Sequence, residues 1–168
     1  GGTGQLAMLV LGIDPGLAVT GYGLIRIGGE RQELVEAGVI RSRDKDPIDQ
    51  RVGKIYAAMT ELLTDCRPDC LSMEDLYSHY NHPKTAVIMA HARGAILAAA
   101  CQAKVPVTSY AATKIKSAIT GNGRARKDQV QQMIMRIFDL AEPLEPVDQS
   151  DALAAALCHA HYLERITV

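Results

Sequence analysis

The sequence predicts an α/β protein in which helices flank a mixed sheet, and the order of its segments carries this prediction. Three strand-like runs come first, joined by short links that contain glycine, which favour antiparallel pairing of neighbouring strands. Helical and strand-like segments then alternate, an order that is typical of parallel strands in one sheet. We therefore expect a five-stranded mixed sheet whose first three strands are antiparallel.

The strands are predicted from short apolar runs that are separated by turn residues. Asp-Pro-Gly follows the first run, Gly-Gly follows the second, and a proline precedes the fourth. The predicted strands cover residues 8–14, 19–27, 33–41, 69–75 and 105–110.

The helices are predicted from apolar residues at helical spacing, with a proline near the start of the first two. They cover residues 47–66, 83–103, 111–120, 126–139 and 149–164. The helix over 83–103 is apolar almost all round, so we expect it to be buried or to face a second copy of the chain. No apolar run is expected to reach the roughly 20 residues that span a bilayer, which argues against a membrane partner.

The composition indicates one folded domain. The chain has 168 residues, of which 48% are hydrophobic and 22% charged, and no repeat or linker divides it. Residues 1–7, GGTGQLA, are interpreted as a cloning remnant, and residues 8–168 as a single domain that starts natively at Met8. Four cysteines without a CxxC pair, and no recognisable secretory signal, predict free thiols in the reducing cytoplasm.

The charges are unevenly distributed, although the net charge is only −1. Residues 114–127 contain five basic residues and no acid, whereas residues 139–151 contain five acids and no base. Cations beside glycines and a helix start suit a phosphate backbone, and a solvated helix face is the alternative interpretation. The candidate DNA-binding residues in the basic segment are Lys114, Lys116, Arg124, Arg126 and Lys127.

Four acids from distant segments form the candidate catalytic site. Asp14 closes the first strand and Glu74 lies at the end of the fourth, so parallel pairing of these strands would bring both to one edge. Asp148 and Asp151 are three residues apart and share a face of the last helix. A tight turn would also explain Asp14, and helix capping would explain the other pair.

Such a cluster of carboxylates would repel strongly unless a cation lay among them. Mg²⁺ prefers oxygen ligands, and paired ions of this kind support in-line displacement at phosphorus. We therefore predict that Asp14, Glu74, Asp148 and Asp151 bind metal and act in catalysis.

One aromatic residue and the histidines complete the candidates. Tyr77, three residues beyond Glu74, could stack on an unpaired base or could anchor a loop. His159 is interpreted as a partly buried histidine with a hydrogen-bond partner rather than as a catalytic group. No role is assigned to the remaining histidines, which are His79, His82, His91 and His161.

Five motifs, in order from Met8 onward, resemble the RuvC family of Holliday junction resolvases. They are LGIDPGLAVTGYG, SMEDLY, AHARG, ITGNGRARKDQV and DQSDALAAALCHAH. The resemblance implies an RNase H-like fold and a homodimer that cuts four-way DNA junctions by paired nicks, leaving 5′-phosphate and 3′-hydroxyl ends. It also implies two Mg²⁺ ions per site, with Mn²⁺ as a substitute, and a role in recombination and DNA repair. A branch-migration motor complex is a further partner that the family suggests.

The resemblance also assigns roles to single residues. Its four catalytic acids fall on the four acids above, its stacking aromatic on Tyr77, and two functional basic residues on Lys116 and Lys127. Tyr77 stands where the best-known members have Phe, and His91 stands where Gln is common.

Three other functions remain open on the sequence alone. An RNA-processing nuclease of the YqgF-like group would have the same fold. An actin-like ATPase could open with a similar phosphate loop, although it needs two such domains. A non-catalytic binding module would have no reason to gather carboxylates near phosphate.

Overall fold

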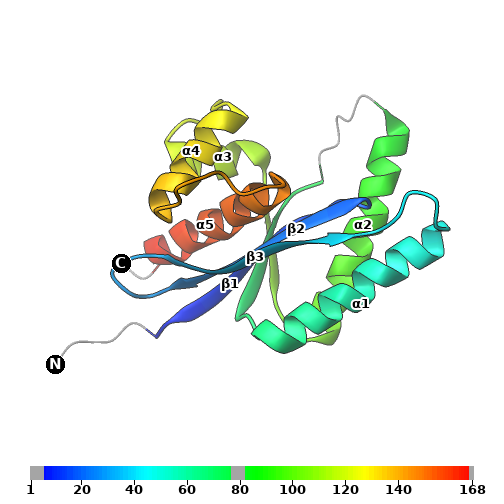
Figure 1. Cartoon of the computed structure of the whole chain (residues 1–168). Coiled ribbons are helices and arrows are strands. Elements are labelled where there is room, and N and C mark those ends of the chain that lie inside the picture. The colour runs from blue at the N-terminus through cyan, green and yellow to red at the C-terminus, as the bar shows by residue number, and fades with distance from the viewer. Residues whose placement is uncertain (1–5, 77–81, 167–168) are drawn as a thin grey trace.

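The computed structural model describes residues 6–76 and 82–166 and contains the predicted mixed sheet. Its strand order is β3-β2-β1-β4-β5, with the first three strands antiparallel and with β4 parallel to both β1 and β5. The sheet crosses the centre of the molecule (Figure 1). Each strand is confirmed within two residues of its predicted bounds. The strands are β1 (Met8–Asp14), β2 (Val19–Ile27), β3 (Glu33–Arg41), β4 (Cys70–Glu74) and β5 (Val107–Tyr110).

Helices cover both faces of this sheet. In Figure 1, α1 and α2 lie on one side of it, whereas α3, α4 and α5 lie on the other. The predicted helix bounds are also confirmed within two residues. The helices are α1 (Ile48–Cys66), α2 (Pro83–Gln102), α3 (Ala112–Thr120), α4 (Lys127–Ile137) and α5 (Asp148–Ile166).

Alternating side chains of the central strands supply two separate hydrophobic cores. In β1, Val10 packs with buried residues of α3, α4 and α5, whereas Leu11 and Ile13 pack with those of α1 and α2. In β4, Cys70 belongs to the first core and Leu71 to the second. Because successive strand residues point to opposite faces, this alternation also decides which face the last residue of each strand occupies.

The backbone of α5 lies unusually close to the sheet. A Cβ atom added at Gly12 would be 1.8 Å from the Ala152 carbonyl oxygen, and one added at Gly21 would be 2.1 Å from the Asp148 carbonyl oxygen. On β4, the buried hydroxyl of Ser72 donates a 2.7 Å hydrogen bond to the Ala155 carbonyl. Small residues on three adjacent strands therefore hold α5 against the centre of the sheet.

The helix α2 differs from the sequence prediction in one respect. By length and composition it could cross a membrane, so the expectation that no segment reaches this threshold is wrong. Core helices of soluble proteins pass the same test, and Ala92, Ile96 and Ala99 of α2 are buried against the rest of the molecule. The helix is only partly covered, however, because Val87 is 56% exposed and Leu97 is 40% exposed.

All four cysteines are free thiols, as predicted.

Candidate active site

The ends of β1 and β4 bring Asp14 and Glu74 to the same edge and the same face of the sheet. The parallel register pairs Gly12 with Ser72 and Ile13 with Met73, so the next residues along the two strands are the two acids. Gly12 and Ser72 both contact α5, and side chains two residues apart share a face. The carboxylates therefore point toward α5, which confirms the parallel adjacency expected from the sequence.

The first turn of α5 supplies the other two acids. Asp148 is the first residue of the helix and Asp151 follows one turn later. The main chain of Asp148 lies directly over Gly21, which pairs with Asp14 across the β1–β2 ladder. A side chain at position 21 would push this helix start away, so the glycine keeps Asp148 close to Asp14.

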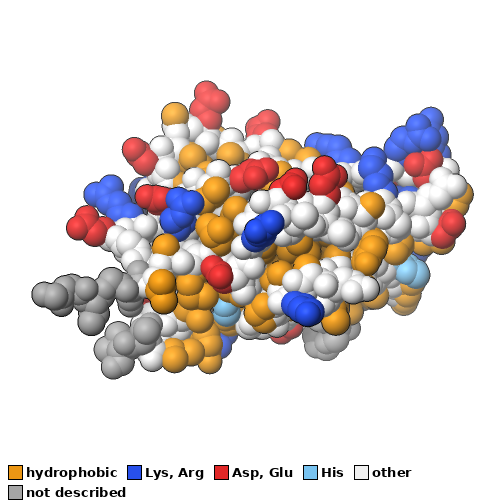
Figure 2. Space-filling view, turned by 90° about the horizontal axis from the view of Figure 1, so that it is seen from below, with side chains coloured by type: hydrophobic (Ala, Val, Ile, Leu, Met, Phe, Trp, Pro, Cys, Tyr) orange, Lys and Arg blue, Asp and Glu red, His pale blue; other side chains and the backbone are white. Residues whose placement is uncertain are grey.

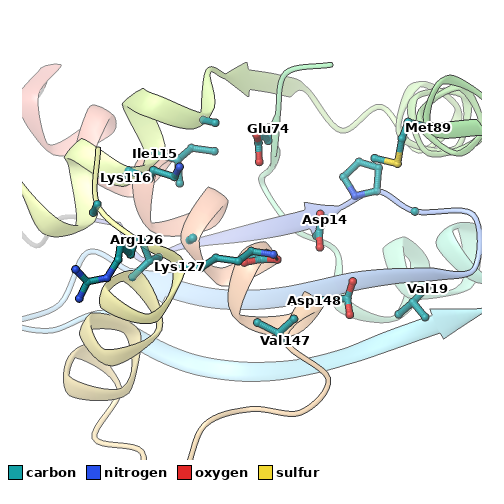
Figure 3. Close-up of a pocket in the computed structure, with 17 residues that line it drawn as sticks. Asp14, Val19, Glu74, Met89, Ile115, Lys116, Arg126, Lys127, Val147 and Asp148 are labelled. Atoms are coloured by element: carbon teal, nitrogen blue, oxygen red, sulfur yellow. The ribbon is translucent and has the colours of Figure 1, made fainter. Parts of the chain in front are cut away.

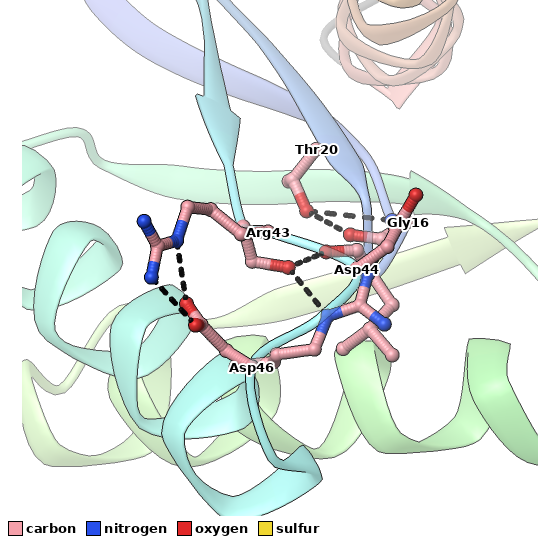
Figure 4. A network of polar contacts seen from close by, with 8 residues as sticks. Gly16, Thr20, Arg43, Asp44 and Asp46 are labelled. Carbon is pink, nitrogen blue, oxygen red and sulfur yellow. Dashed lines mark hydrogen bonds and ion pairs between the residues drawn. The ribbon is translucent and has the colours of Figure 1, made fainter.

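A network of polar contacts holds the loop that follows Asp14 (Figure 4). The Thr20 hydroxyl donates a 2.6 Å hydrogen bond to the Gly16 carbonyl, and the Ser42 hydroxyl donates to the Leu17 carbonyl. Arg51 in turn donates to the Ser42 hydroxyl at 3.0 Å and pairs with Asp44. The loop is thus tied to β2 and to α1, which fixes the direction in which β1 ends.

The four acids line one pocket of about 680 Å³. Figure 3 shows Asp14, Glu74 and Asp148 around this space, with the side chain of Lys127 reaching in among them. Apolar residues that the sequence analysis did not select, including Val19 and Met89, form part of its wall. The remaining charged residues that line it are Lys116, Arg126, Lys127 and Asp151.

The carboxylates oppose one another's ionisation. Burial, followed by the charges of Asp151, Asp148 and Glu74, raises the pKa of Asp14 from 3.8 to about 8. Burial and the charge of Asp151 raise the pKa of Glu74, although this side chain keeps exposed surface. Burial also raises the pKa of Asp151, with a smaller contribution from Asp148. This pocket therefore favours any ligand that brings positive charge.

Two of the predicted basic residues act on the acids directly. The Lys127 ammonium lies 3.4 Å from Asp151 Oδ2 and lowers the pKa of Asp14, Glu74 and Asp151 against the effect of burial. Lys116 also lowers the pKa of Glu74. Since both side chains line the pocket, their cations lie where a phosphate near the acids would need them.

The other basic candidates are placed differently. Arg126 pairs with Asp128 at 3.2 Å, and Figure 3 shows its guanidinium pointing away from the carboxylates. The Lys114 ammonium lies 5.7 Å from the ring centroids of both Tyr110 and Tyr162. Neither Lys114 nor Arg124 lines the pocket, so the structure does not bring these two residues together with the acids.

The residues of the pocket fit a hard divalent cation by their chemistry. Asp14, Glu74, Asp148 and Asp151 offer only oxygen ligands, which Mg²⁺ and Mn²⁺ prefer over nitrogen and sulfur. The raised pKa values of Asp14, Glu74 and Asp151 indicate that positive charge among the acids would relieve repulsion. Within residues 6–76 and 82–166, no three acidic, histidine or cysteine side chains already converge as a metal cluster.

The remaining candidates are settled in part. Tyr77 and His79 lie outside the described residues. His159 is buried, and its Nδ1 shares a 2.6 Å hydrogen bond with the Tyr110 hydroxyl. Burial lowers its pKa, so the neutral form is favoured. This confirms the interpretation of His159 as a partnered core histidine.

Comparison with known proteins agrees with this geometry. A family model described as "Crossover junction endodeoxyribonuclease RuvC" matches residues 10–159. A protein of that name from Rhodopirellula baltica is 45% identical, covering 94% of this chain and 88% of the relative. Another, from Desulforamulus reducens, is 39% identical and covers 92% and 94%.

Solved structures match over a similar extent. The structure of Thermus thermophilus RuvC in complex with a Holliday junction substrate has a TM-score of 0.89 and 36% identity, and covers 95% of this chain and 97% of the other. The yeast mitochondrial Holliday junction resolvase Ydc2 has a TM-score of 0.70 at 14% identity, covering 94% and 80%, and so shares the fold.

The fold of these matches and the carboxylates at the sheet edge place the protein among the nucleases with an RNase H-like fold. Within that class, the family model and the relatives agree. The chain belongs to the RuvC family of crossover junction endodeoxyribonucleases. Membership of this family of nucleases implies dependence on a divalent metal.

Proposed function

We propose that the protein resolves four-way DNA junctions by hydrolysing one phosphodiester in each of two strands of like polarity. The observation that carries this proposal is that four acids from three distant segments line one pocket together with two lysines. Relatives named as crossover junction endodeoxyribonucleases, and a matching structure solved with a Holliday junction, support the same substrate. The products would be ligatable 5′-phosphate and 3′-hydroxyl ends, as required in recombination and repair.

Asp14, Glu74, Asp148 and Asp151 would hold two Mg²⁺ ions, and Mn²⁺ would substitute for them. When bound, such ions activate water and stabilise the leaving oxygen at phosphorus. The chain itself orients the acids through the strand ends and the start of α5. Lys116 and Lys127 would contact the phosphate backbone and offset the negative charge of the acids. Tyr77 would stack on a base at the crossover.

A homodimer would place two such sites on one junction, because a two-fold enzyme matches a two-fold substrate. The uncovered face of α2 is the surface we assign to this contact. We further propose that the protein acts in the cytoplasm, with a branch-migration motor complex as a partner.

The acids are tested by Asp14→Asn and Glu74→Gln, which remove one charge each and keep the shape of the side chain. We expect both variants to bind a four-way junction like the wild type but to cleave it at least about 100-fold more slowly in Mg²⁺. Fluorescence anisotropy measures binding, and gel analysis of labelled strands measures cleavage. Glu142→Gln, an exposed acid outside the pocket, is the matched control and should cleave normally.

Near-normal cleavage by either acid variant would contradict the assignment. Preferential cleavage of structured RNA over the DNA junction by the wild type would instead favour the RNA-processing alternative.

A further inference from the structure

Arg93, in the middle of α2, contacts the backbone of a proposed catalytic residue. Its Nη1 donates a hydrogen bond to the main-chain carbonyl of Glu74, and its Nη2 donates to the Ser109 hydroxyl at 3.4 Å. The arginine is partly buried, and its two hydrogen bonds join α2 to β4 and to β5. Its partner on β4 is the peptide of Glu74.

At the end of β4 the strand is still paired with β5, through Glu74 and Tyr110, but no longer with β1. The β1–β4 ladder ends at the pair Ile13–Met73, one residue before Glu74. On the other side, the Asp75 amide donates a 2.8 Å hydrogen bond to the Tyr110 carbonyl. The Glu74–Asp75 peptide is therefore held by the sheet through its amide alone, and Arg93 supplies a charged donor to its carbonyl.

We propose that Arg93 is a positioning residue for Glu74. By fixing the orientation of the Glu74 peptide, it keeps the carboxylate on the α5 face, opposite Asp14 and Asp151, with which Glu74 interacts electrostatically. Without Arg93 this peptide would keep only its hydrogen bond to Tyr110, and the Glu74 carboxylate would be held less firmly as a metal ligand. This proposal rests on the proposed function, since it assigns Glu74 to the metal site.

The arrangement also links α2 to the site. Val87 and Leu97, on the same helix as Arg93, are exposed apolar residues. A contact that fixes or shifts α2 would therefore reach Glu74 through a single side chain.

The test compares Arg93→Met, which keeps the length of the side chain but has no donor, with Arg93→Lys, which keeps one charged donor. We expect Arg93→Met to bind the four-way junction within about two-fold of the wild type and to cleave it about 10-fold more slowly in single turnover, the loss of one charge-assisted hydrogen bond. The Mg²⁺ concentration for half-maximal cleavage should rise, and Arg93→Lys should regain part of the rate.

A second measurement does not depend on cleavage. Mg²⁺ should raise the thermal unfolding midpoint of the wild type more than that of Arg93→Met, because a misplaced Glu74 binds the ion less well. Arg31→Met, an exposed arginine in the β2–β3 hairpin, is the matched control and should behave like the wild type in every assay.

A wild-type rate and Mg²⁺ requirement in Arg93→Met would overturn the proposal. The proposal would also be overturned if weaker junction binding, or unfolding at the assay temperature, fully explained the slower cleavage by Arg93→Met. Failure of the proposed function is a different result, in which the wild type itself does not cleave junctions, and the Mg²⁺-dependent midpoints then still decide the role of Arg93.

Discussion

At the scale of single residues, the ionised form of Asp14 destabilises the folded protein, although this residue has a proposed catalytic role. Burial and three neighbouring acids raise its pKa to about 8, so the folded protein holds a proton that the unfolded chain, with a pKa of 3.8, releases. The folded state therefore binds more protons than the unfolded state between about pH 4 and pH 8, and its stability falls as pH rises through that window. A divalent cation would reverse this loss by favouring the ionised form.

Asp14→Asn should accordingly be more stable than the wild type at pH 9 in EDTA, by a few kcal/mol, and should differ little from it at pH 4. Urea unfolding at pH 4, 7 and 9 measures the free energies. Adding Mg²⁺ at pH 9 should stabilise the wild type and leave the Asn variant nearly unchanged. Equal stability of the two proteins at pH 9 without metal would show that burial and the neighbouring acids do not disfavour the ionised form of Asp14.

The sequence predicts some of these residues better than others. Asp14 and Glu74 could be predicted because each ends an apolar run, and such runs can be recognised in the sequence alone. The contact of Arg93 with the Glu74 carbonyl could not be predicted, because it joins α2 to β4 through a main-chain atom, and every residue has such an atom. Lys114 was expected to bind DNA from its charge, yet its direction, toward Tyr110 and Tyr162, depends on tertiary packing.

At the scale of elements, two glycines of the sheet set how closely the start of α5 approaches it. Gly12 and Gly21 allow the helix backbone to approach the sheet more closely than any residue with a Cβ atom would permit. Both glycines lie within predicted strands, where a single glycine has several explanations. The need for glycine at these two positions is seen only in the structure, where the backbone of α5 packs directly against them.

Gly21→Ala should therefore displace the first turn of α5, since its methyl group would lie 2.1 Å from the Asp148 carbonyl oxygen. We expect a stable fold, destabilised by about 1–3 kcal/mol, with cleavage reduced far more than junction binding. Urea unfolding, anisotropy and single-turnover cleavage measure the three quantities.

Gly29→Ala is the control for this substitution, because a methyl group there meets only the Arg31 carbonyl oxygen at 3.9 Å. It should leave cleavage unchanged. Normal cleavage by Gly21→Ala would show that the position of Asp148 is not set by this close approach.

At the scale of the whole molecule, the uncovered side of α2 is the feature that a single copy of the chain does not explain. The bounds of α2 could be predicted from its proline and its apolar composition, but which side stays exposed depends on how the helix packs on the sheet. A hollow of about 580 Å³ lies between α1 and α2, lined mainly by small residues such as Ala90, Gly94 and Ala98. Figure 2 views the molecule from below and shows hydrophobic side chains reaching the surface between charged ones.

Small residues beside the protruding Leu97 allow a second copy of the helix to pack closely, and a two-fold contact would bury the same face on both copies. Leu97→Asp should therefore weaken dimerisation by roughly 100-fold, because each copy would bury an unpaired charge. Sedimentation equilibrium measures this change. On a plasmid that extrudes a four-way junction, the wild type should make two nicks in one binding event and yield linear DNA, whereas Leu97→Asp should yield nicked circles.

Val35→Asp, on β3, is the matched control, since Val35 is 43% exposed and does not line the hollow between α1 and α2. It should remain dimeric and yield linear DNA, because a charge at that position meets only solvent in either state. If Leu97→Asp also sediments as the wild type does and still yields linear DNA, the assignment of the proposed dimer contact to α2 is wrong. The exposed apolar residues of α2 would then have to serve a different contact.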